Sequence, residues 1–197
     1  MTTSTKIHHD DLLLVRQALS GSHAAFRRIV ETHEQSVART VKGMLGSTTD
    51  AEDVGQETFI RFYHAMKQYK GEASLKTYLT RIAINLSLNQ IKKRNKRRWI
   101  SMNTDPVVPL ASEDVFNIKD EKEELEYALE QLDPEFRSVV VIRLIQGYTT
   151  KETAEMLDIP QGTVLSRLSR AQQKLKEILN TKNYHDEIHQ KTVNQIV

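Results

Sequence analysis

Residues 163–175 read TVLSRLSRAQQKL, and the spacing of their apolar side chains indicates an amphipathic helix. The apolar positions recur at intervals of four, three and four residues, which places them on one face; they are Val164, Leu168, Ala171 and Leu175. At about 100° per residue, a second set of side chains clusters roughly a third of a turn away. This set, the cationic flank, comprises Thr163, Ser166, Arg167, Arg170 and Lys174.

The cationic flank contains hydroxyl and basic groups but no carboxylate, whereas an ordinary solvated helix intersperses both signs of charge. Arginine can bind a guanine edge bidentately or clamp a phosphate, and Ser and Thr do either more weakly. Taken alone, this segment leaves two interpretations open: a helix that reads nucleic acid, and a solvated helix with surface arginines.

The residues before this helix predict a helix-turn-helix unit. Thr149 and Glu152 match a capping box at the start of a short helix that ends near Leu157. The turn DIPQG follows at 158–162. A short capped helix, a tight turn and a second helix rich in arginine are typical of a DNA reader.

Two more helices are predicted upstream of this unit. Asp133 and Pro134 form an N-cap followed by Pro at the first helical position, and this helix closes at Gly147. An earlier helix is indicated by a further apolar row, which consists of Leu125, Ala128, Leu129 and Leu132.

Charge is strongly segregated around residue 100, although the net charge of the chain is only +2. Residues 92–98 read KKRNKRR, whereas the acidic residues between Asp105 and Glu126 outnumber the two lysines there. We interpret this as a surface that binds a polyanion followed by a tether that is repelled by it. The segment 100–120 also contains Pro106 and Pro109 and has no sustained periodicity, so it is expected to be an acidic flexible linker.

The N-terminal block, 1–99, is expected to be helical from about residue 10. Its apolar positions predict one or two helices up to about Val30 with a break at 20–22, and a separate helix from Glu34 to Leu45. A third helix, capped by Asp50 or a nearby Thr, is expected to end near Gly71. The last helix of the block begins near Ser74, carries two apolar rows and ends in the basic run.

Composition excludes several classes of function. The chain of 197 residues has no cysteine, so disulfides, thiolate zinc sites and cysteine nucleophiles are excluded. No signal-peptide pattern or transmembrane stretch is found, and a cytoplasmic location is expected. No Gly-rich phosphate loop and no nucleophile with an adjacent base is recognised, so neither catalysis nor a cofactor is indicated.

Two histidines near the C-terminal end have the spacing of metal ligands on a helix. His185 and His189 stand at i and i+4 with acids between them, but they lie in a predicted polar tail, 182–197, with no third ligand nearby. We therefore expect no metal.

Two long runs resemble one family. DAEDVGQETFIRFYHAMKQYKGEASLKTYLTRIAINLSLNQIKKRNKRR is similar to region 2 of bacterial sigma factors of the extracytoplasmic-function (ECF) group, in the sigma-70 family. LEQLDPEFRSVVVIRLIQGYTTKETAEMLDIPQGTVLSRLSRAQQKL is similar to their region 4. The resemblance implies an all-α fold of two small domains, region 2 over 1–99 and region 4 over 121–181, held flexibly until core RNA polymerase fixes their spacing.

The resemblance also implies roles for individual residues. The residues that match the core-polymerase-binding motif are Asp53, Gln56, Glu57 and Arg61. Those that match the minus-10 DNA-binding and melting segment are Lys70, Ser74, Lys76, Tyr78, Arg81, Asn85, Asn89, Lys92, Lys93, Arg97 and Arg98. The minus-35 DNA-binding positions are those of the cationic flank. Expected partners are core RNA polymerase, promoter DNA and an anti-sigma factor, without a small-molecule substrate.

Three residues depart from the family pattern. Leu165 stands where many relatives have Lys or Arg, Tyr78 where Trp is common, and Gly55 where an apolar residue is often found. Two rival interpretations are a DNA-binding regulator with an unrelated N-terminal sensor, and a small hydrolase or nuclease. The first rival leaves the N-terminal block without a function, and the second lacks a recognisable site.

Overall fold

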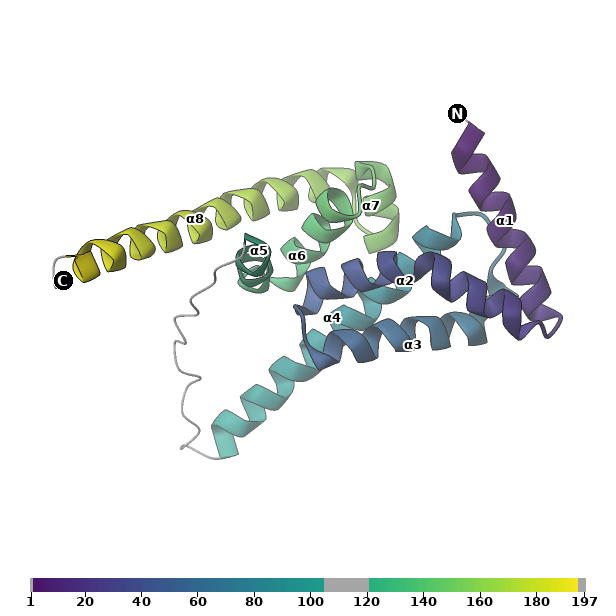
Figure 1. Ribbon diagram of the computed structural model, residues 1–197, viewed down its shortest axis with the longest axis horizontal. Coiled ribbons are helices and arrows are strands. Elements are labelled where there is room, and N and C mark those ends of the chain that lie inside the picture. The colour runs from purple at the N-terminus through teal and green to yellow at the C-terminus, as the bar shows by residue number, and fades with distance from the viewer. Residues whose placement is uncertain (1, 105–120, 195–197) are drawn as a thin grey trace.

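The computed structural model describes the backbone of residues 2–104 and 121–194, and the side chains of 10–101 and 123–180. Within these residues every regular element is a helix, which confirms the all-α class (Figure 1). None of the described helices is long and apolar enough to cross a membrane. The expected tether at 105–120 lies outside the described residues.

The first unit consists of α1 (Thr2–Leu19), α2 (His23–Leu45), α3 (Thr49–Ala65), a short 3-10 turn (Met66–Gln68) and α4 (Leu75–Thr104). Its longer helices pack on one another around fully buried side chains, among them Ile29, Met44 and Phe62. Local polar groups start the helices as the sequence predicts. Ser22 accepts from the amide of Ala25, and Thr48 accepts from the amide of Ala51.

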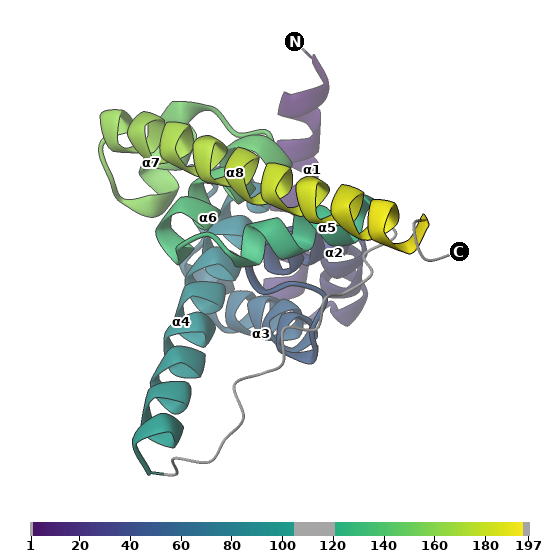
Figure 2. The ribbon, with the colours of Figure 1, turned by 90° about the vertical axis from the view of Figure 1, so that its left-hand side faces the viewer.

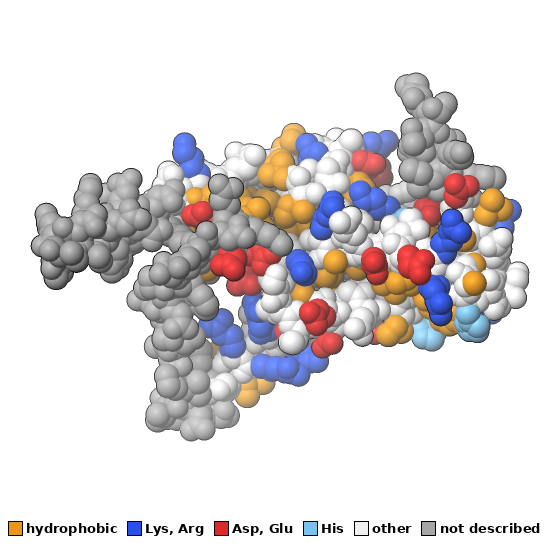
Figure 3. All heavy atoms as spheres, in the orientation of Figure 1, with side chains coloured by type: hydrophobic (Ala, Val, Ile, Leu, Met, Phe, Trp, Pro, Cys, Tyr) orange, Lys and Arg blue, Asp and Glu red, His pale blue; other side chains and the backbone are white. Residues whose placement is uncertain are grey.

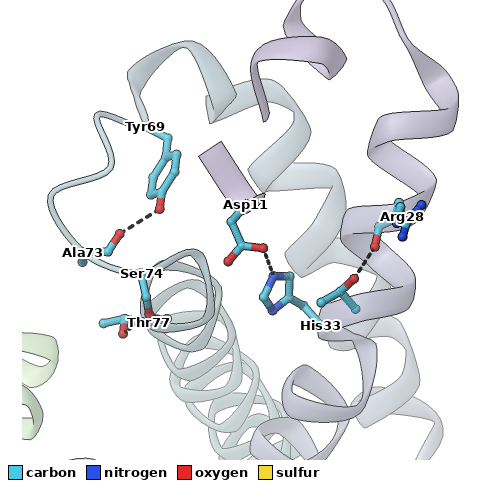
Figure 4. Close-up of polar contacts among 8 residues, drawn as sticks. Asp11, Arg28, His33, Tyr69, Ala73, Ser74 and Thr77 are labelled. Carbon is cyan, nitrogen blue, oxygen red and sulfur yellow. Dashed lines mark hydrogen bonds and ion pairs between the residues drawn. The ribbon is translucent and has the colours of Figure 1, made fainter. Parts of the chain in front are cut away.

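Helix α2 is continuous, which corrects the prediction of a separate helix from Glu34 to Leu45. Its buried row runs at intervals of four residues through Ile29, His33 and Val37, so a histidine stands where an apolar residue would mark the stripe. The His33 Nε2 atom lies 3.0 Å from a carboxylate oxygen of Asp11 in α1, and both residues are buried (Figure 4). This polar pair joins α1 to α2 inside the first unit.

The second unit consists of α5 (Glu121–Glu130), α6 (Pro134–Val140), a π-helical segment (Val141–Ile145), α7 (Thr150–Leu157) and α8 (Gln161–Asn194). Both hydrogen bonds of the capping box between Thr149 and Glu152 are present. Helix α6 packs against α8, and Val164 and Ala171 of the expected apolar stripe are fully buried. The turn between α7 and α8 places Asp158 in the left-handed conformation, with φ of 54°.

Two helices extend beyond the ranges expected from the sequence. Helix α4 reaches Thr104 and projects away from the other helices of the first unit (Figure 2). Helix α8 reaches Asn194, through the segment predicted as a polar tail. Neither Gly nor Pro occurs between 163 and 194, so no residue there forces the helix to stop.

The two units are in direct contact. Helices α5 and α6 and the π segment lie against α2, and α6 and α7 lie against α4 (Figures 1 and 2). Val141, Ile142 and Tyr148 of the second unit belong to the same buried cluster as the core of the first. In this structure the units are therefore docked rather than held apart.

Candidate functional site

The acidic flank of α3 comprises Asp53, Gln56 and Glu57 and faces outward from the first unit. Asp53 and Gln56 are exposed. Glu57 accepts a hydrogen bond from Arg61 Nε at 2.9 Å, one helical turn away. Because both side chains of this pair are about half exposed, it contributes little to stability and can exchange for a partner's groups.

An apolar hollow of about 250 Å³ lies between α2 and α3 beside this flank. Gly55 lies on its wall, and a side-chain carbon added there would meet nothing closer than a methyl of Val41 at 3.9 Å. Apolar lining also comes from Val37 and Phe59, with Glu34 and Glu52 among the charged lining residues. The one feature of the sequence that relates to this hollow is Gly55, which stands where an apolar residue is often found in the family.

Tyr69 and Tyr78 form an aromatic cluster with Phe62 near the start of α4. Their ring centroids lie 5.2 Å apart, and each also lies about 6 Å from the buried ring of Phe62 in edge-on geometry. The Tyr69 hydroxyl donates to the carbonyl of Ala73 at 2.7 Å, which holds the loop before α4 (Figure 4). Burial, assisted by the nearby Asp11 and Tyr78, raises the pKa of Tyr69 to about 12. Tyr78 is thus part of the packed cluster and only partly accessible.

The start of α4 is capped by one of the predicted site residues. Ser74 Oγ accepts from the amide of Thr77 at 3.1 Å, so this serine has a structural role as the cap of the helix. Lys70 and Lys76, on either side of it, are exposed.

The outer face of α4 carries a row of exposed polar and basic groups. Arg81, Asn85 and Asn89 repeat every four residues and therefore share one side of the helix. Further along, the exposed cations of the basic run are Lys92, Lys93, Lys96, Arg97 and Arg98. Figure 3 shows Lys and Arg side chains gathered where α4 leaves the first unit. This positive surface can follow a chain of phosphates.

Some residues of the cationic flank of α8 are paired with acids of their own unit, and others are exposed to solvent. Arg167 is hydrogen-bonded to the carboxylate of Glu135, and Lys174 Nζ lies 3.6 Å from a carboxylate oxygen of Asp133. Ser166 and Arg170 are exposed, whereas Thr163 is partly buried. Leu165, between these positions, has 56% of its surface exposed. The sequence suggested the flank but not that part of it is engaged by acids of α6 and its cap.

The candidate residues form three separate surfaces rather than one pocket: the acidic flank on α3, the basic face of α4 and the cationic flank of α8. Among the side chains that the structure describes, no group of three or more His, Asp or Glu residues is placed to hold a metal ion. His185 and His189 lie outside the described side chains. Such extended charged surfaces are suited to binding macromolecules.

Comparison with protein families gives two matches in order along the chain. A model described as Sigma-70 region 2 matches residues 29–97, and one described as Sigma-70, region 4 matches residues 128–177. Together they cover more than half of the chain and correspond to the first and second units. All three charged surfaces lie within the matched ranges, apart from Arg98.

Two curated relatives illustrate the similarity. The chain is 32% identical over 155 residues to the ECF RNA polymerase sigma factor SigE of Mycolicibacterium smegmatis, covering 77% of this chain but only 60% of that protein. It is 27% identical over 179 residues to the ECF RNA polymerase sigma factor SigW of Bacillus subtilis, covering 84% of this chain and 94% of the relative.

Solved structures share the fold. CnrH in complex with the cytosolic domain of CnrY superposes with a TM-score of 0.64 at 26% identity, over 87% of this chain and 98% of that chain. The sigma factor RpoE of Bartonella quintana, in complex with the anti-sigma factor NepR, gives the same TM-score at 21% identity, over 79% of this chain and 96% of that chain.

Proposed function

The chain belongs to the ECF group of the sigma-70 family of RNA polymerase sigma factors, and on this premise we propose that it binds core RNA polymerase and directs promoter-specific transcription initiation. The observation that carries the proposal is the order of the two matched regions on two helical units, one presenting an acidic flank and a basic helix, the other a helix-turn-helix. The chain acts in the cytoplasm, where polymerase and promoter DNA are found.

The acidic flank of α3 binds the clamp of the largest polymerase subunit. The exposed carboxylate of Asp53 and the exchangeable Glu57–Arg61 pair offer charge to a basic partner surface. The apolar hollow beside them gives the same surface a place for an apolar side chain.

The basic face of α4 binds the minus-10 element and helps to separate its strands. Arg81, Asn85 and Asn89 face outward in one row, so they can meet bases and backbone together. The basic run continues this row along the phosphates, and Lys70 lies in the adjoining loop. Holding unpaired bases requires such cationic tracks next to aromatic groups, and Tyr69 and Tyr78 are the aromatic groups close by.

The second unit reads the minus-35 element with α8. Ser166 and Arg170 face solvent near the beginning of the helix, where helix-turn-helix proteins contact base edges. Arg167 and Lys174 are paired with largely exposed acids of their own unit, so these pairs can exchange for contacts with backbone phosphates.

An anti-sigma factor regulates the chain. In support, the similar CnrH structure is a complex with the cytosolic domain of CnrY, and a second structure of the same fold holds an anti-sigma factor. Its binding would be expected to cover the surfaces that polymerase uses.

Reconstitution tests the proposed function. Purified chain is added to core RNA polymerase, and transcripts from a genomic promoter library are mapped at their 5′ ends. Initiation at a shared pair of upstream elements, absent with core alone, supports the proposal. A chain that binds DNA but never associates with core polymerase would instead be an ordinary helix-turn-helix regulator.

A further inference from the structure

Trp99 is the single tryptophan of the chain, and it lies on the surface of α4. With 69% of its surface exposed, it is more accessible than any other large apolar side chain that the structure describes. It directly follows the basic run, and the match to Sigma-70 region 2 ends before it, at residue 97. An exposed tryptophan beside arginines is typical of a binding surface, because its large rigid ring offers contact area at little cost in conformational entropy.

The direction of Trp99 follows from helix geometry. Helix α4 runs without a break from Leu75 to Thr104. Trp99 is 18 residues from Arg81, and at about 100° per residue this makes about five full turns, so the two side chains leave the helix in the same direction. Lys92 and Lys96 lie between them within about 60° of that direction, and both are exposed. Trp99 therefore continues the exposed face that carries the predicted minus-10 residues.

Every charged side chain of α4 is basic. The 30 residues of this helix include no Asp or Glu, although the chain as a whole has nearly as many acidic as basic residues. Lys96, Arg97 and Arg98 directly precede Trp99 and are exposed. Such a surface attracts a polyanion, and a ring set among its cations can contact the apolar parts of that polyanion. Nucleic acid is the partner that matches both properties.

The place of Trp99 along the DNA follows from its distance to the predicted minus-10 row. Asn89 is the last member of the row that begins with Arg81, and Trp99 lies beyond it by about 15 Å at 1.5 Å per residue. This distance is the length of roughly four base pairs at 3.4 Å each. The chain then continues from α4 to the second unit, which is proposed to read minus-35 (Figure 2). The end of α4 is therefore expected on the minus-35 side of the minus-10 element, where the strands stay paired.

We propose that Trp99 packs against the promoter duplex between the minus-35 and minus-10 elements. The indole ring lies along the deoxyribose groups at the edge of a groove, and the neighbouring cations contact the phosphates on either side. Because the ring is uncharged, its contribution to affinity does not depend on salt, whereas that of each phosphate contact does. This inference rests on the proposed function, since it adds a contact to the DNA-binding surface of α4.

The salt dependence of DNA binding tests this contact. Holoenzymes are reconstituted from core polymerase and the full-length wild-type, Trp99→Ala or Trp99→Phe chain, and their affinity for a fluorescent promoter fragment is measured over a range of salt. Trp99→Ala should lower the affinity about fivefold at every salt concentration without changing the slope of log K against log salt, and Trp99→Phe should retain most of the affinity. Ile100→Ala removes a neighbouring exposed apolar side chain, about 100° around the helix, and is the matched control.

Equal affinities of the wild-type and Trp99→Ala holoenzymes would overturn the inference. A changed slope would overturn it too, because the substitution would then be acting through the cations of α4. Since Trp99 is exposed, the variant is expected to keep its fold, which circular dichroism verifies. If the wild-type holoenzyme itself initiates at no promoter, the proposed function is at fault rather than this contact.

A second series of DNA fragments distinguishes paired from unpaired DNA. Both promoter elements are kept, and a short mismatched bubble is placed immediately on the minus-35 side of the minus-10 element. The bubble removes the duplex that Trp99 is proposed to contact, so the ratio of wild-type to Trp99→Ala affinity should fall from about five to near one. A ratio that stays the same or rises on the bubble would contradict the duplex contact, and a rise would assign the ring to an unpaired base.

The single tryptophan also provides a direct spectroscopic signal. A hydroxylated tryptophan analogue at position 99 absorbs at longer wavelengths than tryptophan, so it can be excited selectively in the presence of core polymerase. Its fluorescence should stay unchanged when core polymerase is added and should change when promoter DNA follows. A change that is already complete with core polymerase alone would assign Trp99 to a polymerase contact and would refute the inference.

Discussion

Arg167 of α8 is hydrogen-bonded to the carboxylate of Glu135 in the first turn of α6, within the second unit. Arg170, one turn further along the same flank, is exposed. The two arginines therefore have different surroundings: Arg167 is paired with an acid of its own unit, and Arg170 faces solvent. This difference determines which substitution tests base reading directly.

Arg170→Ala should weaken minus-35-dependent initiation by about 1–3 kcal/mol if the guanidinium contacts a base. The measurement is run-off transcription on promoters with intact and scrambled minus-35 elements. Lys176→Ala removes an exposed cation of α8 outside the flank and serves as the control. A promoter profile that is the same for both variants would exclude Arg170 from base recognition.

Leu165 should read a thymine methyl in the minus-35 element, because an exposed leucine on the reading helix can offer only apolar contact. Replacing single thymines by deoxyuridine removes that methyl and nothing else. One such replacement should weaken holoenzyme binding several-fold with the wild-type chain and have no effect with Leu165→Ala. Equal sensitivity in both proteins would show that the leucine reads no methyl.

Asp53→Lys should impair association with core polymerase by at least about tenfold, or ~1.4 kcal/mol. The lysine places a positive charge against the basic surface of the clamp that the aspartate is proposed to contact. Binding is measured by fluorescence anisotropy of labelled chain. Asp10→Lys makes the same charge change at an exposed site on α1 and should bind normally. Matched losses in the two variants would point to a general charge effect.

Replacing Lys92, Lys93, Arg97 and Arg98 by Gln should lower the affinity for promoter DNA and its dependence on salt together. Each lost phosphate contact reduces the slope of log K against log salt by about 0.7–0.9. The exposed pair Arg27 and Arg28 on α2, replaced in the same way, is the control. An unaltered slope would mean that the basic run does not touch the backbone.

Tyr69→Phe should alter stability at alkaline pH. The pKa of Tyr69 is about 12 in the folded chain and 10.0 without its surroundings, so the unfolded chain loses this proton first. The contribution is present below pH 10 and is lost as pH rises towards 12. Urea unfolding should show a weaker decline over this range in Tyr69→Phe, while Tyr127→Phe, at an exposed site, should follow wild type.

Helix starts and turns could be predicted because their signals are local. Ser22, Thr48 and the Thr149–Glu152 box lie within a few residues of the amides they cap, so their function can be read from spacing. Gly147, with φ of 77°, likewise follows the helix that it was expected to end.

Contacts between distant segments could not be predicted in this way. His33 interrupts the apolar stripe of α2, and only Asp11, 22 residues away, explains why a polar residue is buried there. Gly43 and Val141 have ordinary local surroundings, and nothing in either segment indicates that they meet. The pairing of Arg167 with Glu135 could not be predicted for the same reason, since it depends on how α6 packs against α8.

The C-terminal part of helix α4 projects away from the other helices of the first unit (Figure 2). Of its side chains within the described range, the last buried one is Ile91, and the backbone from Lys92 to Thr104 extends for about 20 Å at 1.5 Å per residue. Tilting the first unit by about 10° would carry the tip through roughly 3.5 Å, close to the rise of one base pair. The angle between the first unit and core polymerase therefore determines which base pair the tip of α4 reaches.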